Sequence, residues 1–385
     1  MRKLLLGLLF LLVGAGTATW AYAPYLPQLI AEGVPPLTWP AVGHFAPLAG
    51  DDKAPGLSLS PEAATRPLVP ELGAAFAATG GKALLVARDG RLELEHYAPG
   101  ISDATRFNSF SMAKTLVGAL VYKALAEGRI SSLDQTLGEL LPADRGLAGV
   151  TLRSLLEMRS GIAFDHGEAK ADAISGDKTT DTSANPFGPL ARLHFLGLGA
   201  IENGLVAEVA TTPAEFSYQN INTALLGEVL ETVYGEPLAT LLTTRIWGPS
   251  GAGSAFWRQP AADASVSAYC CIYATARDWI RIGMFLAGNG RPEAPFLPDA
   301  LWRAFLGLDI GYAERRDDNY GHHIRQNVLD RAGQPLQGPF SYLMGQGGQV
   351  LYLMPDKGLV VYRSGEQAQL LHSTLYRAWN SIYAP

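Results

Sequence analysis

The stretch that decides the fold runs from Ser111 to Gly128 and reads SMAKTLVGALVYKALAEG. Good helix formers fill this stretch, and Gly128 is typical of the residue that follows a helix C-terminus. The lead-in from Phe107 to Phe110 contains small polar residues of the kind that begin a helix. We therefore predict a helix with Ser111 near its N-terminus, where free N–H groups and the helix dipole favour a developing negative charge.

Ser111 and Lys114 lie one helical turn apart on the same face of this helix. Phe110, Val117 and Gly118 surround the lysine on the helix, and such apolar surroundings disfavour the charged ammonium form. A neutral lysine can take the proton of a serine hydroxyl and so create a nucleophile. The pattern predicts a Ser111 nucleophile with Lys114 as its base, against the simpler reading of a helix cap beside a surface lysine.

The same four-residue pattern occurs a second time, as Ser175-Gly176-Asp177-Lys178. Residues 171–185 around this copy are rich in Ser, Gly, Asp and Thr and have no apolar period. Such a composition predicts a loop, which has no helix to hold the two side chains in register. We therefore assign the chemistry to the first copy.

Composition limits the classes of function. The 385 residues are 48% hydrophobic and 17% charged, which predicts one large or two intimately packed globular domains. The net charge of −6 argues against a nucleic-acid partner. The seven histidines show no metal-ligand spacing, so neither a metal nor a cofactor is expected. The two cysteines, Cys270 and Cys271, are adjacent; two small buried hydrophobic residues on a strand are favoured over a strained vicinal bridge.

The N-terminus carries Arg2 and Lys3, followed by an uncharged run from Leu4 to Ala23. Residues 1–23 are either a cleaved signal peptide or a membrane anchor, and the anchor is slightly favoured because the run is just long enough to span a bilayer. Both readings predict an exported protein, periplasmic or membrane-anchored, that contacts the membrane only through this segment. Residues 24–70 are rich in Pro, Gly and Ala and predict a tether or a wrapping segment.

Two hairpins are predicted at opposite ends of the chain. Strands at 82–88 and 92–97 meet at Asp89-Gly90, a strong turn signal, and strands at 349–354 and 359–363 meet at Pro355-Asp356-Lys357-Gly358. Helices are predicted at about 222–232, 274–286 and 372–383, and most of 133–258 has a helical pattern.

This arrangement predicts an α+β fold: an antiparallel β-sheet flanked by helices, built from both chain ends, with an inserted, mostly helical domain. The predicted body is residues 71–385. Its α/β part covers about 71–130 and 265–385, and its helical part covers about 131–264.

Two further elements could complete a site around Ser111. Tyr218-Gln219-Asn220 places a tyrosine and an asparagine two residues apart, just before a predicted helix. Gly345-Gln346-Gly347-Gly348-Gln349 places glycines at the start of a strand, where a substrate backbone can approach closely. Each signal alone is weak, since a turn tyrosine and a flexible strand entry explain them equally well.

Taken in order, S-x-x-K, Y-x-N and a glycine-rich strand start resemble the serine β-lactamase and penicillin-binding-protein superfamily. The resemblance is greatest to the class C β-lactamase-related branch, which includes esterases, D-amino-acid peptidases and 6-aminohexanoate-dimer hydrolases. Residues 151–161 and 274–279 are similar to further stretches of that branch, and the resemblance covers roughly 83–379.

The resemblance implies a β-lactamase/transpeptidase-like fold and a role for each matching position. Ser111 would be acylated, Lys114 would be its base, Tyr218 would relay a proton to the leaving group, and Asn220 would orient Lys114 or the substrate. The third motif would fall on Gln346, Gly347 and Gly348, and the backbone N–H groups of Ser111 and Gln349 would form the oxyanion hole. No cofactor is implied.

The neutral Gln346 departs from the family pattern, because many relatives have a cation there that binds a substrate carboxylate. Loss of a charge-assisted hydrogen bond weakens such binding by roughly 1–3 kcal/mol. The departure favours a small ester or amide substrate over a β-lactam or a D-Ala-D-Ala peptide, unless Arg325 or Arg363 restores the charge.

The leading hypothesis is therefore a serine hydrolase. A β-lactamase or DD-peptidase, a penicillin-recognising protein that acylates and stalls, and a binding module with vestigial motifs are the alternatives. The chain has no G-x-S-x-G elbow, which argues against a Ser-His-Asp hydrolase of the α/β-hydrolase type.

Overall fold

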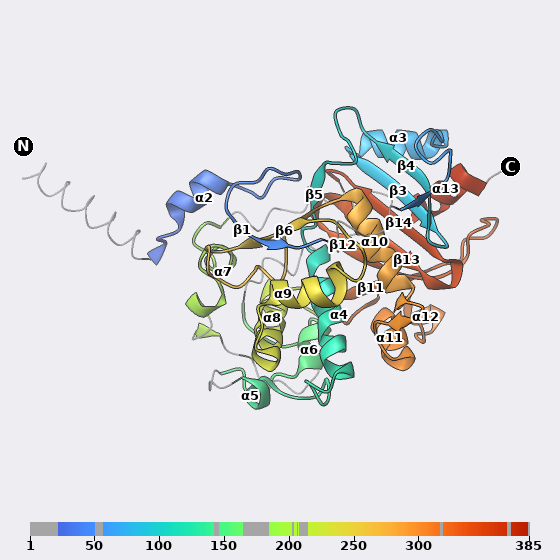
Figure 1. Ribbon diagram of the computed structural model, residues 1–385. Helices are drawn as coiled ribbons and strands as arrows, with labels where there is room; N and C mark the ends of the chain where they lie inside the picture. Colours follow the sequence, from blue (N-terminus) through green and yellow to red (C-terminus); the bar gives the residue numbers. More distant parts are fainter. Residues whose placement is uncertain are drawn as a thin grey trace, which may run out of the picture.

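The computed structural model places an eight-stranded sheet beside a mostly helical region (Figure 1). The structure describes residues 22–50, 57–141, 146–164, 185–201, 204–205, 207, 215–315, 319–367 and 371–383.

The large sheet joins strands from both chain ends, as the sequence predicts. Its order is β10-β11-β12-β13-β14-β3-β4-β2, and every pairing is antiparallel except that of β2 with β4. The strands are β2 (Ser58–Leu59), β3 (Ala83–Arg88), β4 (Arg91–Tyr97), β10 (Asn319–Gly321), β11 (Ile324–Leu329), β12 (Gly338–Gly345), β13 (Gln349–Met354) and β14 (Leu359–Ser364). The α+β class is thereby confirmed.

Both predicted hairpins are present. The β3–β4 turn has Asp89 at φ 48° and Gly90 at φ 79°, the two left-handed residues that a tight two-residue hairpin requires. The β13–β14 turn is one 3₁₀ turn at Pro355–Lys357, closed by left-handed Gly358. The N-terminal hairpin and the C-terminal hairpin meet inside the sheet through β3 and β14, where Val86 lies opposite Val361.

Strand β3 is buried on both faces, which explains its unbroken apolar sequence. Leu84 and Val86 belong to a core with α3 (Pro70–Ala78) and α13 (Leu371–Tyr383). Leu85 and Ala87, on the opposite face, belong to the larger core that includes α10 (Ala276–Ala287). The sheet is therefore the middle layer between two helical layers, with α10 crossing one face (Figure 1).

Helix α10 begins two residues later than predicted, because Ala274 and Thr275 end strand β7. Thr275 caps the helix: its side chain accepts from the N–H of Asp278, while the Asp278 carboxylate accepts from the Thr275 N–H at 3.0 Å. The closing helix, predicted from 372, runs from Leu371 to Tyr383.

Helix α4 (Met112–Ala126) forms the centre of the helical region and is buried on nearly all sides. It packs against α8 (Asn220–Tyr234), α9 (Leu238–Leu242) and α11 (Asp299–Leu306). The other helices are α5 (Leu137–Leu140), α6 (Leu152–Leu156), α7 (Pro189–Leu196) and α12 (Tyr312–Arg315), with a π-helical turn at Thr243–Trp247. A helix that is buried on nearly all sides does not need a separate polar face, and this explains the nearly continuous apolar sequence of α4.

A second, four-stranded sheet lies between these regions, in the order β1-β6-β7-β5. Its strands are β1 (His44–Leu48), β5 (Arg106–Asn108), β6 (Ala255–Gln259) and β7 (Ile272–Thr275), and a separate hairpin joins β8 (Gly290–Arg291) to β9 (Ala294–Pro295). Strand β6 falls inside the range where the sequence pattern predicts mostly helix.

The described part of the N-terminal segment wraps onto the body. Helix α2 (Leu26–Glu32) ends at Glu32, whose carboxylate pairs with Arg258 of β6 at 2.7 Å, with both side chains buried. Tyr25 stacks on Phe195 of α7, and β1 adds an edge to the small sheet. The described residues 22–50 of this segment therefore lie against the body.

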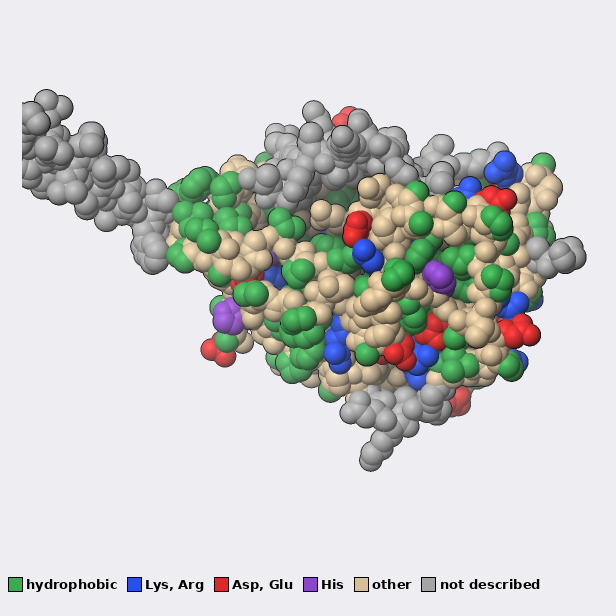
Figure 2. All heavy atoms as spheres, turned by 90° about the horizontal axis from the view of Figure 1, so that it is seen from above, with side chains coloured by type: hydrophobic (Ala, Val, Ile, Leu, Met, Phe, Trp, Pro, Cys, Tyr) green, Lys and Arg blue, Asp and Glu red, His purple; other side chains and the backbone are tan. Residues whose placement is uncertain are grey.

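Apolar side chains are exposed along this wrapping segment. Ile30 is 82% exposed, Val34 65% and Val42 62%. Figure 2 shows hydrophobic side chains gathered at the end of the molecule where α2 lies, whereas acidic and basic side chains are interspersed over the rest of that face. Within the described ranges, no helix combines the length and hydropathy needed to cross a bilayer.

Candidate active site

Ser111 lies at the junction between strand β5 and helix α4. The chain turns sharply there, with Phe110 in a left-handed conformation at φ 43°. Asn108 at the end of β5 stabilises the turn, since its Oδ1 accepts from the Phe110 N–H at 2.9 Å and its Nδ2 donates to the Tyr273 hydroxyl at 3.0 Å. Ser111 occupies the N-cap position of α4, as predicted.

Lys114 lies directly beside Ser111 and is 1% exposed. Its Nζ is 3.0 Å from Ser111 Oγ and donates to the Tyr269 carbonyl oxygen at 3.0 Å. Within the described residues, no Asp or Glu forms an ion pair with Lys114. The first S-x-x-K copy therefore has the geometry of a nucleophile and its base. The second copy, at 175–178, lies outside the described residues.

Tyr218 completes the group from a distant part of the chain. Its ring centroid is 4.9 Å from Lys114 Nζ, and its edge packs against Tyr320 of β10 at 5.8 Å between centroids. Tyr218 lies two residues before α8, which starts at Asn220. The structure thus brings three of the predicted residues together: Ser111, Lys114 and Tyr218.

Asn222, two residues beyond the predicted Asn220, is the more deeply buried asparagine. It is 1% exposed, accepts from Ser160 Oγ at 2.6 Å and donates from Nδ2 to Met158 Sδ at 3.1 Å. These bonds tie α8 to the Ser-Gly turn that follows α6. Sequence reasoning missed Asn222; its place one turn after Gln219 on an otherwise apolar helix face was the available signal.

The glycine-rich turn approaches the loop before Ser111 through its first residue, Gly345. A Cβ on Gly345 would lie 3.1 Å from Phe110 Cβ and would overlap the carbonyl oxygen of Ser109. Gln346 to Gly348 form a 3₁₀ turn, and Gln349 then begins β13. Gln349 Nε2 donates to Gly365 O at 2.5 Å, so its side chain supports the turn from behind.

The two arginines proposed as replacement cations have other partners. Arg363 is buried and donates to the carbonyl oxygens of Gly347 at 3.3 Å and Gly348 at 2.8 Å, and to Thr79. Its guanidinium therefore supports the glycine turn from below. Arg325 stacks over the ring of Tyr320 at 5.5 Å, one aromatic ring away from Tyr218.

His322 and His323 are the only histidine cluster in the sequence; His323 is buried, and His322 is half-buried. Burial, followed by the charge of Lys114, lowers the pKa of His323 to about 3, and burial, followed by Arg153, lowers that of His322 to about 4. His323 Nε2 is 3.0 Å from Thr223 Oγ1 of α8, and its Nδ1 is 3.1 Å from Leu156 O. The cluster is thus a neutral connection between helices. Across the described residues, no group of three or more His, Cys, Asp or Glu side chains could hold a metal ion.

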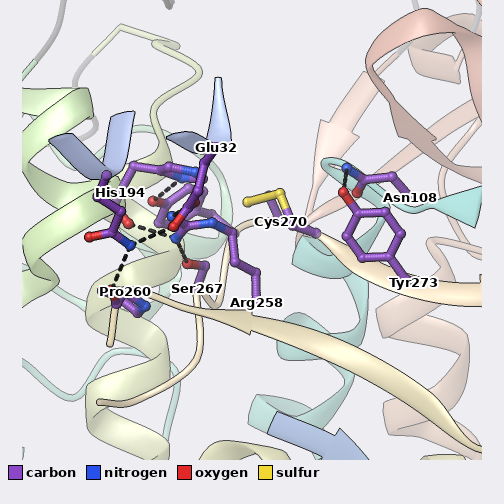
Figure 3. A network of polar contacts seen from close by, with 11 residues as sticks. Glu32, Asn108, His194, Arg258, Pro260, Ser267, Cys270 and Tyr273 are labelled. Carbon is purple, nitrogen blue, oxygen red and sulfur yellow. Dashed lines mark hydrogen bonds and ion pairs between the residues drawn. A yellow bond between two sulfur atoms is a disulfide. The ribbon is translucent and has the colours of Figure 1, made fainter. Parts of the chain in front are cut away.

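The turn at 269–272 corrects the expectation for the cysteines. Cys270 and Cys271 do not lie on a strand as two separate thiols; they form a vicinal disulfide in the turn before β7. Cys271 has φ 73°, a left-handed conformation that sequence periodicity cannot reveal. Figure 3 shows the disulfide close to Arg258 and Ser267, within the polar network that the wrapping segment joins through Glu32.

A cavity of about 420 Å³ adjoins the site on the far side of Tyr269. Helices α7 and α8 and residues 260–269 form its walls, and Glu228 and Glu231 are among the lining residues. The Tyr269 hydroxyl lies 3.3 Å from His194 Nδ1. Tyr269 therefore contacts the lysine through its carbonyl group and also lines the cavity.

Comparisons with known proteins identify the family and the fold of the chain. The family described as Beta-lactamase matches residues 71–367. A 6-aminohexanoate-dimer hydrolase of Paenarthrobacter ureafaciens is 27% identical over 237 residues, which span 58% of this chain and only 56% of that relative's length.

Solved structures show the same fold at low sequence identity. A Bacillus anthracis protein proposed to be a 6-aminohexanoate-dimer hydrolase has a TM-score of 0.67 at 20% identity, covering 94% of this chain and 95% of its own. A D-stereospecific amidohydrolase from Streptomyces has a TM-score of 0.56 at 22% identity, covering 80% of this chain and 96% of its own.

Proposed function

Because the chain belongs to the beta-lactamase family, we propose that it is a serine hydrolase that cleaves a small ester or amide through an acyl-enzyme on Ser111. The observation that carries this proposal is the 3.0 Å separation of Ser111 Oγ and the buried Lys114 Nζ, beside the ring of Tyr218. The relatives described as hydrolases of amide substrates support the reaction class.

The proposed reaction has two halves. Neutral Lys114 accepts the Ser111 proton while Oγ attacks the substrate carbonyl carbon, and its remaining hydrogens allow it to keep donating to the Tyr269 carbonyl. The tetrahedral intermediate collapses when a proton passes to the leaving alcohol or amine, for which Tyr218 is the proposed relay. Water then attacks the acyl-enzyme carbonyl carbon and gives a proton to Lys114. The second tetrahedral intermediate collapses as that proton returns to Ser111 Oγ, which releases the acid and restores the free enzyme.

In this proposal the oxyanion is stabilised by backbone N–H groups at the start of α4 and at the glycine turn. The position of Ser111 at the helix N-terminus supports the first donor. The close approach of Gly345 to Ser109 supports the second, since it places strand β12 against the nucleophile's own loop. Asn220, Gln346, Gly347, Gly348 and Gln349 keep their predicted binding or oxyanion roles as parts of the proposal.

The substrate class follows from charge. Gln346 is neutral, and the cation beside the glycine turn, Arg363, already donates to Gly347, Gly348 and Thr79. A carboxylate at the third motif would therefore lack the charge-assisted bond that a lysine there would supply. This arrangement favours esters and amides that need no carboxylate over β-lactams and D-Ala-D-Ala peptides.

The test compares three substrates: a short-chain p-nitrophenyl ester, the linear dimer of 6-aminohexanoate and a chromogenic cephalosporin. We expect turnover of the ester or of the linear amide by the wild type, none by Ser111→Ala, and unchanged turnover by Ser102→Ala, which alters an exposed serine. Equal activity in Ser111→Ala would refute the proposal. Turnover of the cephalosporin alone would identify a β-lactamase instead.

We also propose that the body acts outside the cytoplasmic membrane, because two basic residues precede the uncharged run from Leu4 to Ala23. The experiment is expression of the full chain in a bacterium, followed by fractionation into cytoplasm, membrane and periplasm. Recovery in the cytoplasm would contradict this location.

A further inference from the structure

The vicinal disulfide lies in the part of the chain that holds the reacting groups. The Sγ atoms of Cys270 and Cys271 are bonded, and these are the two cysteines of the sequence. Both residues are buried, with Cys270 9% exposed and Cys271 2% exposed. The mechanism proposed above assigns no role to this bond.

Residues 269–272 contact Lys114 and the loop before Ser111 through backbone groups. The Tyr269 carbonyl accepts from Lys114 Nζ at 3.0 Å, and the Cys271 N–H donates to Phe110 O at 3.4 Å. The Ile272 N–H donates to Ser109 Oγ at 2.9 Å, and Ile272 O accepts from the Ser109 N–H at 2.8 Å.

The contacts of Tyr269 and Cys271 depend on backbone direction in the turn, whereas Ile272 already belongs to β7. The disulfide closes a small ring through the 270–271 peptide and so restricts the dihedral angles on both sides of it. Cys271 is held at φ 73°, which is unfavourable for a residue with a side chain and persists only where the surroundings enforce it. Without the ring, the turn can relax towards negative φ, and the Tyr269 carbonyl and the Cys271 N–H would then change direction.

The other side of the turn is firmly anchored. Trp257 Nε1 donates to Cys270 O at 2.9 Å, and the Arg258 N–H donates to Cys271 O at 3.1 Å. Arg258 is itself held by the buried Glu32 (Figure 3). Strand β6 therefore fixes the carbonyl side of the turn, so relaxation is directed towards Lys114 and the Ser109–Phe110 loop.

We propose that the Cys270–Cys271 disulfide is a positioning element for Lys114 and Ser111, and that its reduction by a dithiol converts the enzyme to a slow form. The proposal rests on the serine-hydrolase function given above. In the reduction, the Sγ–Sγ bond breaks, each cysteine gains one hydrogen, and the dithiol loses both hydrogens and closes into its own disulfide. Cys270, the more exposed partner, is the sulfur that a small dithiol attacks.

The experiment uses the full chain, before and after native treatment with dithiothreitol, with alkylation and intact mass reporting the thiols. The readouts are kcat and KM for a p-nitrophenyl ester, the rate at which a fluorophosphonate labels Ser111, and the melting temperature. We expect reduction to lower kcat and the labelling rate by about 10–100-fold, the order expected for a misplacement near 1 Å, with little change in KM. Reoxidation should restore both rates.

Paired variants separate backbone direction from general stability. The kcat and labelling rate of Cys270→Ala/Cys271→Ala should equal those of the reduced enzyme and should not change when dithiothreitol is added. Cys270→Ala/Cys271→Gly should be more active than that variant, because glycine adopts the left-handed conformation without a penalty. If the disulfide were purely structural, its reduction would lower the melting temperature. At temperatures below the new melting temperature, kcat and the labelling rate would then stay unchanged.

Several results would overturn the proposal. Free thiols in the untreated protein, or equal kcat and labelling in oxidised and reduced enzyme, would refute the positioning role while leaving the serine hydrolase intact. Absence of both ester turnover and Ser111 labelling in the untreated enzyme would refute the proposed function and this inference together.

Discussion

Substituting alanine for Gly345 tests whether strand β12 and the Ser109–Phe110 loop fit together as described. Gly345 has φ −127°, which any residue can adopt, so the added methyl group is the whole perturbation. That methyl group would lie 3.1 Å from Phe110 Cβ and well under 3.0 Å from the backbone oxygen of Ser109. Both distances are shorter than 3.4 Å, the distance at which ordinary van der Waals contact begins. Because the closest atom is backbone, a side-chain rotation cannot relieve the clash, and the loop or the strand must move.

The required shift is several tenths of an ångström or more, within one and two residues of Ser111. A misplacement near 1 Å costs about 10²-fold in rate, so we expect kcat/KM for the ester to fall by roughly 10–100-fold. Overpacking should also lower the free energy of unfolding by about 1–3 kcal/mol.

Gly149→Ala is the matched control, because a Cβ there meets nothing within 4 Å. It should leave activity and stability near the wild-type values. The assays are ester hydrolysis and urea unfolding of the same preparations. Wild-type kcat/KM and unfolding free energy in Gly345→Ala would refute the close approach of β12 to Ser109.

Three further predictions concern polar side chains at the candidate site and in the interior. Lys114→Met and Tyr218→Phe should each lower kcat by about 10²-fold or more while the melting temperature stays near wild type, since each removes a group proposed to transfer a proton; wild-type kcat in either would contradict its role. The pKa of His323 is lowered from 6.5 to about 3 in the folded protein, so the free energy of unfolding should fall as the pH falls below 6.5, by up to about 1.4 kcal/mol per pH unit. In urea titrations, His323→Gln should lose less of its free energy of unfolding than the wild type between about pH 6 and pH 5. Equal losses in the two proteins would contradict this prediction. Glu32→Gln should lower the free energy of unfolding by about 3–5 kcal/mol, because it leaves the Arg258 guanidinium buried without its carboxylate; calorimetry showing no change would rule this out.

The sequence predicts those parts of the fold whose signals are local. The β3–β4 hairpin follows from Asp89-Gly90, and α4 follows from a long run of helix formers closed by Gly128. Strands β1, β6, β11 and β12 are not predicted, because their apolar patterns are short and their stability comes from partners far along the chain. His44 of β1, for example, pairs with Gln259 of β6.

The candidate site divides in the same way. Ser111 and Lys114 are near neighbours on one helix, so their spacing in the sequence is enough to predict their contact. Tyr218 is predicted because the Y-x-N motif follows the S-x-x-K motif in the order that the family shows. Tyr269 and the disulfide are different. The contact of Tyr269 with Lys114 is made by a backbone carbonyl, which any residue type could supply, and the bond between Cys270 and Cys271 depends on a left-handed backbone. The contact of Tyr269 leaves no pattern in the sequence, and the adjacency of Cys270 and Cys271 permits a vicinal bridge without indicating the left-handed backbone.

The measurement that tests the central claim most directly is trapping of the acyl-enzyme. Full-length wild type and Lys114→Met are mixed with a slowly deacylating p-nitrophenyl ester, quenched in acid, and analysed by intact mass and peptide mapping. We predict one acyl group on Ser111 in the wild type and very little in Lys114→Met within the same time. An acyl group on another residue, or equal acylation of Ser111 without Lys114, would contradict the account.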